Sequence, residues 1–220
     1  MEMKTGIETF DGVKRLIIVA AHPDDLETLC GGTVALLVQQ GLTQLSIRMI
    51  ARAVGCSVGS IYFHFKNKDE LIHALIEEGF DKLVALQDAT EAAITDPRSR
   101  LSALCRNYYN FALSNPEYYE IMFTLKPERM ARYPAEKYRK ARRSVEVVSR
   151  AVEAYSRQQK TDIPHPYLVA HLIWCFMHGI VTLMQARRID RSILPEAIIE
   201  TSIQQILNLN LSTPPLPSGG

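Results

Sequence analysis

The stretch from Thr43 to Leu71, TQLSIRMIARAVGCSVGSIYFHFKNKDEL, predicts two short helices, a tight turn between them and the start of a longer third helix. Ser46 stands where an N-cap is wanted, and apolar residues follow it at helical spacing as far as Val54. Gly55 can adopt the left-handed conformation that ends a helix and reverses the chain. Ser57 can then cap the second helix. This arrangement is typical of a helix-turn-helix whose second helix is exposed.

The composition of this segment favours contact with DNA. Between Thr43 and Lys68 there are four basic residues, Arg48, Arg52, Lys66 and Lys68, and there is no acidic residue. A local positive field of this kind attracts the phosphate backbone, and hydroxyl groups can donate to it. The inward residues of the second helix are expected to be Val58, Ile61 and Phe65. The residues predicted to contact DNA are Ser46, Arg48, Ser57, Val58, Gly59, Ser60, Tyr62, His64 and Lys68.

The order GCSVGSIYFHFKNKDEL resembles the recognition region of the TetR family of transcriptional regulators, which follows the pattern G-V-S-x-G-x-[LI]-Y-x-[HY]-F-x-[ns]-K-[ed]-x-L. The resemblance implies an all-α protein that binds operator DNA and responds to a ligand. An alternative is that the two short helices are only a packing unit, because helix pairs around a glycine turn are common. The number of matches in order favours the DNA-binding interpretation.

The composition of the whole chain is that of an ordinary globular protein. Its 220 residues are 47% hydrophobic with a formal net charge of +1. No apolar run reaches the ~18 residues of a membrane-spanning helix, and the first residues lack the pattern of a signal peptide. A cytoplasmic protein is therefore expected. The four cysteines are scattered without a CxxC pair, so we expect reduced, buried thiols at Cys30, Cys56, Cys105 and Cys175.

The N-terminal segment carries a different signal. The apolar run LIIVAA at residues 16–21 predicts a strand, and it ends at His22-Pro23-Asp24-Asp25. This segment, with the following Gly31-Gly32-Thr33, resembles the opening of LmbE-like zinc-dependent N-deacetylases. The resemblance implies that His22 and Asp25 bind zinc and that Asp24 acts as general base. It ends at about Gly41, and Leu26 stands where that motif has glutamate.

A zinc hydrolase is nevertheless not the favoured interpretation. Such an enzyme needs three protein ligands, and everything after Gly41 is predicted to be helical, so no second strand and loop supplies the third ligand. Residues 26–40 instead fit the first helix of a TetR-type domain that precedes the turn at Gly41. We therefore predict no catalytic residues, no metal and no cofactor. The expected domains are an extension at 1–25, a DNA-binding domain at 26–72, a helical domain at 73–210 and a disordered tail at 211–220.

The remainder of the chain is predicted to be helical throughout. Asp96-Pro97 and Asn115-Pro116 each mark a helix start. The expected helices beyond the helix-turn-helix run over about 69–93, 97–111, 116–123, 135–159, 167–188 and 194–209. The fourth of these carries many basic residues, which leaves open a second nucleic-acid surface. A solvated helix face is favoured, because Glu136, Glu146 and Glu153 are interleaved with the cations.

The helix at 167–188 is apolar around most of its circumference, which is more than one core face requires. Its segment HLIWCFMHGIVTLM, with Trp174, His178 and Gly179, resembles the C-terminal domain of a TetR subgroup named for its W-H-G residues. We expect homodimerisation through the last two helices, packed as a four-helix bundle. His171 and His178 share a helix face, but a partnered histidine explains each better than a metal site does.

A ligand pocket is expected among aromatic and thioether side chains of the helical domain. A largely apolar effector with one or two polar anchors would suit such a pocket, and His178 is a candidate anchor. An alternative for each of these residues is simple core filling. The predicted ligand-binding residues are Tyr108, Phe111, Tyr119, Met122, Phe123, Trp174, Met177 and His178.

The sequence thus predicts a ligand-responsive transcriptional regulator, specifically a repressor, that binds double-stranded operator DNA as a homodimer. A zinc-dependent N-deacetylase is the alternative. A helical scaffold that binds only protein is a third class. A measurement of zinc in the purified protein distinguishes the enzyme from the other two classes. A DNA-binding measurement distinguishes the regulator from the scaffold.

Overall fold

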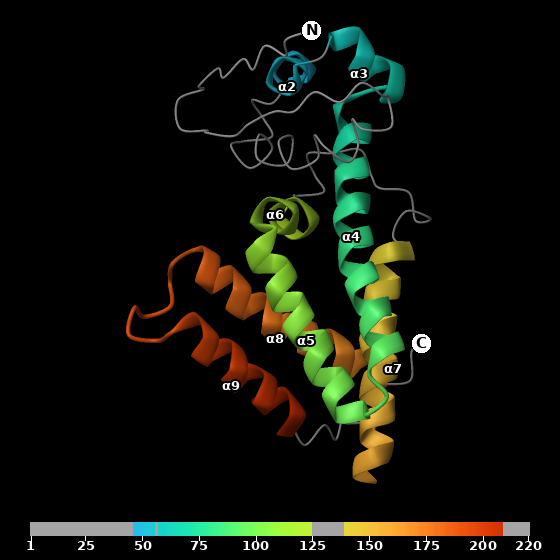
Figure 1. Cartoon of the computed structure of the whole chain (residues 1–220), viewed down its shortest axis with the longest axis vertical. Helices are drawn as coiled ribbons and strands as arrows, with labels where there is room; N and C mark the ends of the chain where they lie inside the picture. The colour runs from blue at the N-terminus through green and yellow to red at the C-terminus, as the bar shows by residue number, and fades with distance from the viewer. Residues whose placement is uncertain (1–45, 56, 125–138, 209–220) are drawn as a thin grey trace, which may run out of the picture. The chain divides into compact units, whose positions relative to one another are not determined.

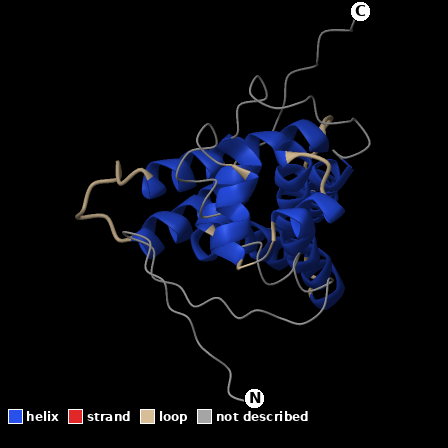
Figure 2. Ribbon diagram, turned by 90° about the horizontal axis from the view of Figure 1, so that it is seen from above, coloured by secondary structure: helices blue, strands red, loops and turns tan. Residues whose placement is uncertain are grey.

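The computed structural model of the chain describes residues 46–55, 57–124 and 139–208. Every regular element in these ranges is an α-helix (Figures 1 and 2), which confirms the predicted all-α class. The predicted N-terminal extension with its His22-Pro23-Asp24-Asp25 motif, the helix expected at 26–40 and the C-terminal tail lie outside the described residues. The chain divides into two units, Met1–Leu71 and Ile72–Gly220. The division falls one residue before the domain boundary expected from the sequence.

The first unit contains the helix pair α2 (Ile47–Val54) and α3 (Val58–His64). Ser46 caps α2, because its Oγ accepts a hydrogen bond from the backbone N–H of Met49 at 3.2 Å. Gly55 ends α2 with φ of 76°, a left-handed conformation that disfavours residues with a Cβ. Ser57 Oγ caps α3 by accepting from the N–H of Ser60 at 3.0 Å. Both caps and the turn are where the sequence predicts them.

The second unit is a helical body. Its helices begin with α4 (Lys68–Ala93), which starts in the first unit, and continue with α5 (Pro97–Ser114), α6 (Pro116–Thr124), α7 (Arg139–Gln159), α8 (Pro166–Gln185) and α9 (Pro195–Asn208). Asp96 caps α5 by accepting from the N–H of Ser99 at 2.8 Å, as its position before Pro97 predicts. The expected start of α7 at residue 135 lies outside the described range.

Helix α5 is the centre of the body, because it packs against α6, α7, α8 and α9. In Figure 1 it crosses the middle of the body, with α8 and α9 running beside each other. Its fully buried Leu101, Leu104 and Tyr109 join residues of α7, α8 and α9 in one core. Burial of each such side chain contributes about 1.5–3 kcal/mol. Tyr109 also pairs its hydroxyl with Ser202 Oγ of α9 at 2.7 Å, so the core polar group is satisfied.

The end of α8 differs from the prediction. The helix ends at Gln185 rather than at residue 188. Arg187 has φ of 53°, its N–H donates to Met184 O, and the N–H of Arg188 donates to Leu183 O. This is the Schellman pattern, in which a left-handed residue closes the last turn. No glycine marks the end of this helix in the sequence. The prediction relied on the spacing of apolar residues alone, and it therefore placed the helix end too late.

Three basic residues of α7 form ion pairs with acidic residues of α4. Lys140 pairs with Asp81, Arg143 with Asp88, and Arg150 with Glu91, at distances of 2.6–2.8 Å. The sequence predicted a solvated face balanced by glutamates on the same helix, whereas the partners of these three cations come from another helix. The pairing accounts for these three cations without a nucleic acid. Each exposed pair contributes little to stability, roughly 0–1 kcal/mol.

Candidate functional site

The α2–α3 pair presents an exposed face on its second helix. Ile50 and Ala51 of α2 and Ile61 of α3 are buried. On α3, Gly59 and Phe63 each lie two residues from Ile61, and two residues turn a helix by about 200°. These two residues are therefore opposite the buried side chain, and both are exposed. The second helix is anchored by one residue and free on the other side, as a recognition helix must be.

The structure places the predicted DNA-contacting residues as follows. Arg48, Gly59, Tyr62 and His64 are exposed, and Val58, Ser60 and Lys68 are half-buried. Ser46 and Ser57 are exposed caps, and because each Oγ accepts from a backbone N–H, its hydroxyl hydrogen is still able to donate to a phosphate. A cap and a phosphate contact are thus compatible roles for one serine.

Phe63 is a feature that the sequence analysis missed. Its side chain is 84% exposed, the largest fraction among the exposed large hydrophobic residues of the described chain. A ring this exposed contributes little to packing, although it meets the ring of its neighbour His64 edge-on. A ring in that position is suited to apolar contact with thymine methyl groups. The family pattern leaves this position variable, so only its exposure identified it.

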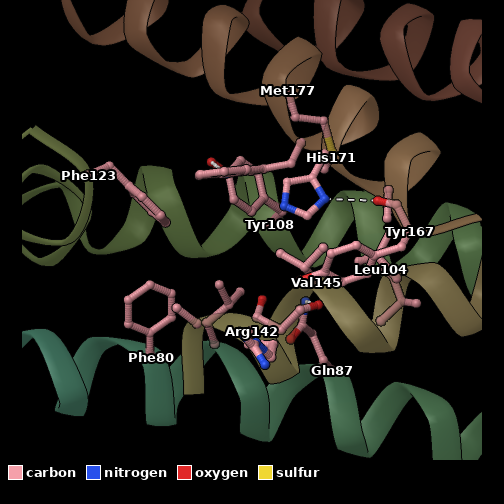
Figure 3. A pocket seen from close by; sticks show the side chains of 16 residues that line it. Phe80, Gln87, Leu104, Tyr108, Phe123, Arg142, Val145, Tyr167, His171 and Met177 are labelled. Carbon is pink, nitrogen blue, oxygen red and sulfur yellow. Dashed lines mark hydrogen bonds between the residues drawn. The ribbon is translucent and has the colours of Figure 1, made fainter. Parts of the chain in front are cut away.

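The body contains a cavity of about 240 Å³ (Figure 3). Its walls come from α4, α5, α6, α7 and α8, and they are mainly aromatic and aliphatic. Of the predicted ligand-binding residues, Tyr108, Phe123, Trp174 and Met177 line it. Phe111, Tyr119, Met122 and His178 are not among its lining residues. Phe111 is buried in the core instead, and Met122 lies against Gly79, where an added Cβ would meet its sulfur.

A chain of hydrogen bonds runs from the cavity wall to His178. Trp174 Nε1–H donates to the Tyr108 hydroxyl at 3.1 Å. The Tyr108 hydroxyl lies 3.0 Å from the Tyr119 hydroxyl, and both hydroxyls are within hydrogen-bond distance of His178 Nδ1. Because an indole nitrogen can only donate, the Tyr108 oxygen accepts from Trp174, and the Tyr108 hydrogen is left to donate to Tyr119 or to His178. Burial raises the pKa of Tyr108 and brings that of Tyr119 to about 12, so both remain neutral.

His178 is expected to make stability depend on pH. Burial lowers its pKa below the ordinary 6.5, so the folded protein binds fewer protons than the unfolded chain. The stabilising effect of the neutral ring is therefore complete above about pH 6.5 and is lost as the pH falls below it. The melting temperature should decrease between pH 7 and pH 5, and His178→Gln should remove part of that decrease. His171→Gln is the control, and an unchanged pH profile in the His178 variant would contradict the assignment.

One face of α8 remains uncovered. Leu172, Phe176 and Leu183 are exposed at spacings of four and seven residues, and Gly179 lies between them. A Cβ at Gly179 would meet nothing within 4 Å, so the fold of one chain does not require glycine there. Helix α8 is also long and apolar enough, by length and composition, to cross a membrane. Cys175 is exposed on this helix, which corrects the expectation that it is buried, whereas Cys105 is buried as expected.

The described residues contain no group of three or more histidine, cysteine or acidic side chains that could hold a metal ion. His171 Nδ1 lies 2.9 Å from the carbonyl oxygen of Tyr167, so this nitrogen carries the hydrogen. This bond and an edge-on contact between the two rings orient His171. A backbone partner thus accounts for His171, and the two tyrosines account for His178.

Two family models match the chain. The model of the tetR family of bacterial regulatory proteins matches residues 31–75, and that of tetracyclin repressor-like C-terminal domains matches residues 101–206. The chain belongs to the tetR family. The first match includes residues 31–41, which the resemblance to N-deacetylases had also covered, and nothing in the comparisons supports that resemblance. The resemblance of the N-terminal motif to N-deacetylases is therefore not borne out.

Individual proteins are also similar to this chain. An uncharacterized HTH-type transcriptional regulator from Haemophilus influenzae is 28% identical over 96 residues, which cover 44% of this chain and 51% of that protein. The chain thus spans about half the length of this curated relative. A Rhodococcus sp. RHA1 protein of unknown function has the same fold, with a TM-score of 0.69, 23% identity, and coverage of 83% of this chain and 93% of that one.

A third protein of this fold was solved with a ligand. FadR from Bacillus subtilis, in complex with stearoyl-CoA, superimposes with a TM-score of 0.65 at 14% identity, covering 81% of this chain and 96% of that chain. At this identity the likeness concerns the fold alone. It shows that the helical architecture described above is shared with that protein.

Proposed function

We propose that the protein is a cytoplasmic transcriptional repressor whose α3 helix enters the major groove of operator DNA and whose body binds a small, largely apolar effector. The exposed face of α3 carries this proposal. It displays Gly59 and Phe63 opposite the buried Ile61, and Tyr62 and His64 are exposed beside them. The segment from Thr43 to Lys68 has no acidic residue. A helix with that surface is suited to a polyanion and to base edges.

The proposed DNA contacts are of two kinds: contacts to phosphates, which position the protein on the duplex, and contacts to base edges, which read the sequence. Lys68 and Tyr62, with the cap hydroxyls of Ser46 and Ser57, are placed to hold phosphates, which fixes orientation without sequence information. Arg48, Ser60, Phe63 and His64 are the candidates for base edges, and Gly59 allows close approach of the backbone. Val58 is expected to contact a base or sugar through its half-exposed methyl groups.

The partner of the uncovered α8 face is proposed to be a second copy of the same chain. Leu172, Phe176 and Leu183 form a continuous apolar stripe, and Gly179 would let two helices approach closely at its centre. Glycine in a helix costs about 1 kcal/mol relative to alanine, so a close contact is a reason to retain it. A dimer through α8 and α9 would place two recognition helices about one DNA turn, ~34 Å, apart.

The cavity is proposed as the effector site. Helix α4 contributes Phe80, Leu83 and Gln87 to its wall and continues into the DNA-binding unit, so a ligand there touches the element that connects the two. FadR shares this fold and binds stearoyl-CoA, so the architecture is compatible with an apolar ligand. The effector changes DNA affinity only by its differential binding to the two states of the body.

The test is a titration of the full-length protein against DNA fragments selected from a random library. The proposal expects nanomolar binding to an enriched sequence, a steep decrease in affinity with salt, and release by compounds that raise the melting temperature. Recovery of no enriched sequence would contradict the regulator and leave the protein-binding scaffold as the alternative.

A further inference from the structure

The cavity contains a buried acceptor that no group in the described part of the chain satisfies. Gln87 of α4 lines the cavity and is only 2% exposed. Its Nε2 donates to the carbonyl oxygen of Ser144 at 3.3 Å, whereas its Oε1 has no hydrogen-bond partner among the described residues. Because a carbonyl can only accept, this bond fixes which end of the amide faces Ser144. Oε1 is already shielded from solvent in the free protein, so a ligand that supplies an O–H or N–H there would satisfy an acceptor that is otherwise unpaired.

The cavity also has a cation at its wall. Arg142 of α7 lines the cavity, and within the described part of the chain no ion pair or hydrogen bond is recorded for it. Its neighbour Arg143 is bound to Asp88 instead, and Lys140 to Asp81. Arg142 thus differs from Lys140 and Arg143 in that it lines the cavity, and it is an exposed residue. A guanidinium in that position is suited to a carboxylate, which it can bind through two parallel hydrogen bonds.

The remaining residues of the cavity wall favour a ligand with an aromatic ring. Aromatic rings from four helices, those of Phe80, Tyr108, Phe123, Tyr167 and Trp174, surround the space. In Figure 3, His171 and Met177 of α8 lie across the cavity from Gln87 of α4. His171 has its hydrogen on Nδ1, so its Nε2 is a second acceptor. Rings pack favourably edge-to-face against an aromatic ligand, and about 240 Å³ holds on the order of ten non-hydrogen atoms at ~30 Å³ per water-sized group.

We infer that the effector is a small aromatic acid that carries a hydroxyl or N–H group, with its carboxylate on Arg142 and its donor on Gln87 Oε1. This inference rests on the proposed function, since it names the chemistry of the same cavity. It replaces His178 as the polar anchor, because His178 is engaged by Tyr108 and Tyr119. Gln87 belongs to α4, so a ligand bound to it acts directly on the helix that continues into the DNA-binding unit.

The test uses defined probes on the full-length protein. The three hydroxybenzoate isomers carry both groups, their methoxybenzoate counterparts lack the donor, and their methyl esters lack the charge. Calorimetry should show at least one isomer binding roughly tenfold more tightly than its methoxy counterpart and its methyl ester. Failure of all three isomers to bind, or equal binding of the methoxy compounds, would overturn the inference.

Two variants assign the contacts. Gln87→Leu should remove the preference for the hydroxyl, and Arg142→Leu the preference for the acid over the ester. Arg143→Leu is the matched control, because it removes a neighbouring cation that faces α4. Gln87→Leu replaces an unsatisfied acceptor with an apolar group of similar size, so the free protein should remain folded; Gln87→Met is the second variant if it does not. Preferences that persist in the variants would overturn the assignment.

The same probes separate this inference from the proposed function. Hydroxybenzoate binding with the expected preferences, but without any change in operator affinity, would uphold the inferred site and contradict its regulatory role. Operator release by neutral apolar compounds, with no preference for acids, would uphold the regulator and overturn the inference.

Discussion

Phe176→Glu is expected to convert the protein from a dimer into a monomer and to weaken operator binding by more than about a hundredfold. Phe176 is 45% exposed at the centre of the apolar stripe on α8. A carboxylate there would be buried against a second copy without a partner, which costs several kcal/mol and is far more than loss of the ring alone. Light scattering measures the first effect and fluorescence anisotropy with operator DNA the second.

The matched control is Leu86→Glu. Leu86 is an apolar residue of α4 that is 43% exposed, nearly the same as Phe176, but it lies outside the α8 stripe. This variant should remain dimeric and bind operator normally. A Phe176→Glu protein that is folded and still dimeric at micromolar concentration would contradict the dimer proposed here.

Phe63→Glu is expected to abolish specific DNA binding, with a loss of at least about a hundredfold, while the melting temperature and the dimer remain unchanged. The side chain is almost fully solvent-exposed in the free protein, so its replacement removes no packing. In the complex the carboxylate would face phosphates and base edges, where like charges repel. Leu86→Glu serves again as the control for an added negative charge.

Phe63→Ala gives the complementary result. Loss of the ring without added charge should weaken binding by roughly tenfold and relax the preference for an A·T pair at one operator position. A new selection with the variant would reveal that relaxation. An unchanged consensus would mean that Phe63 does not read a base.

The local features of the fold were predictable because their causes are local. Ser46, Gly55, Ser57 and Asp96 act within three or four residues of their own positions, so capping rules apply directly. The recognition helix followed from the same rules. Its most exposed ring, Phe63, did not, because exposure depends on which neighbours pack against Ile61.

The contacts between helices were not predictable from a single sequence. The basic run of α7 suggested a solvated face, but the partners Asp81, Asp88 and Glu91 lie more than fifty residues away. Aromatic composition identified part of the cavity wall, namely Tyr108, Phe123, Trp174 and Met177. It could not distinguish a wall from the core or from the hydrogen-bonded chain at Tyr119 and His178, and it did not indicate Gln87 or Arg142.

The most direct test of the central claim is a hydroxyl-radical footprint of the full-length protein on its selected operator. The account predicts two protected patches about one helical turn, ~34 Å, apart, on a sequence with two-fold symmetry. Both patches should disappear together in Phe63→Glu and when the effector is added. A single protected patch, or protection that survives Phe63→Glu, would contradict DNA recognition by a dimer through α3.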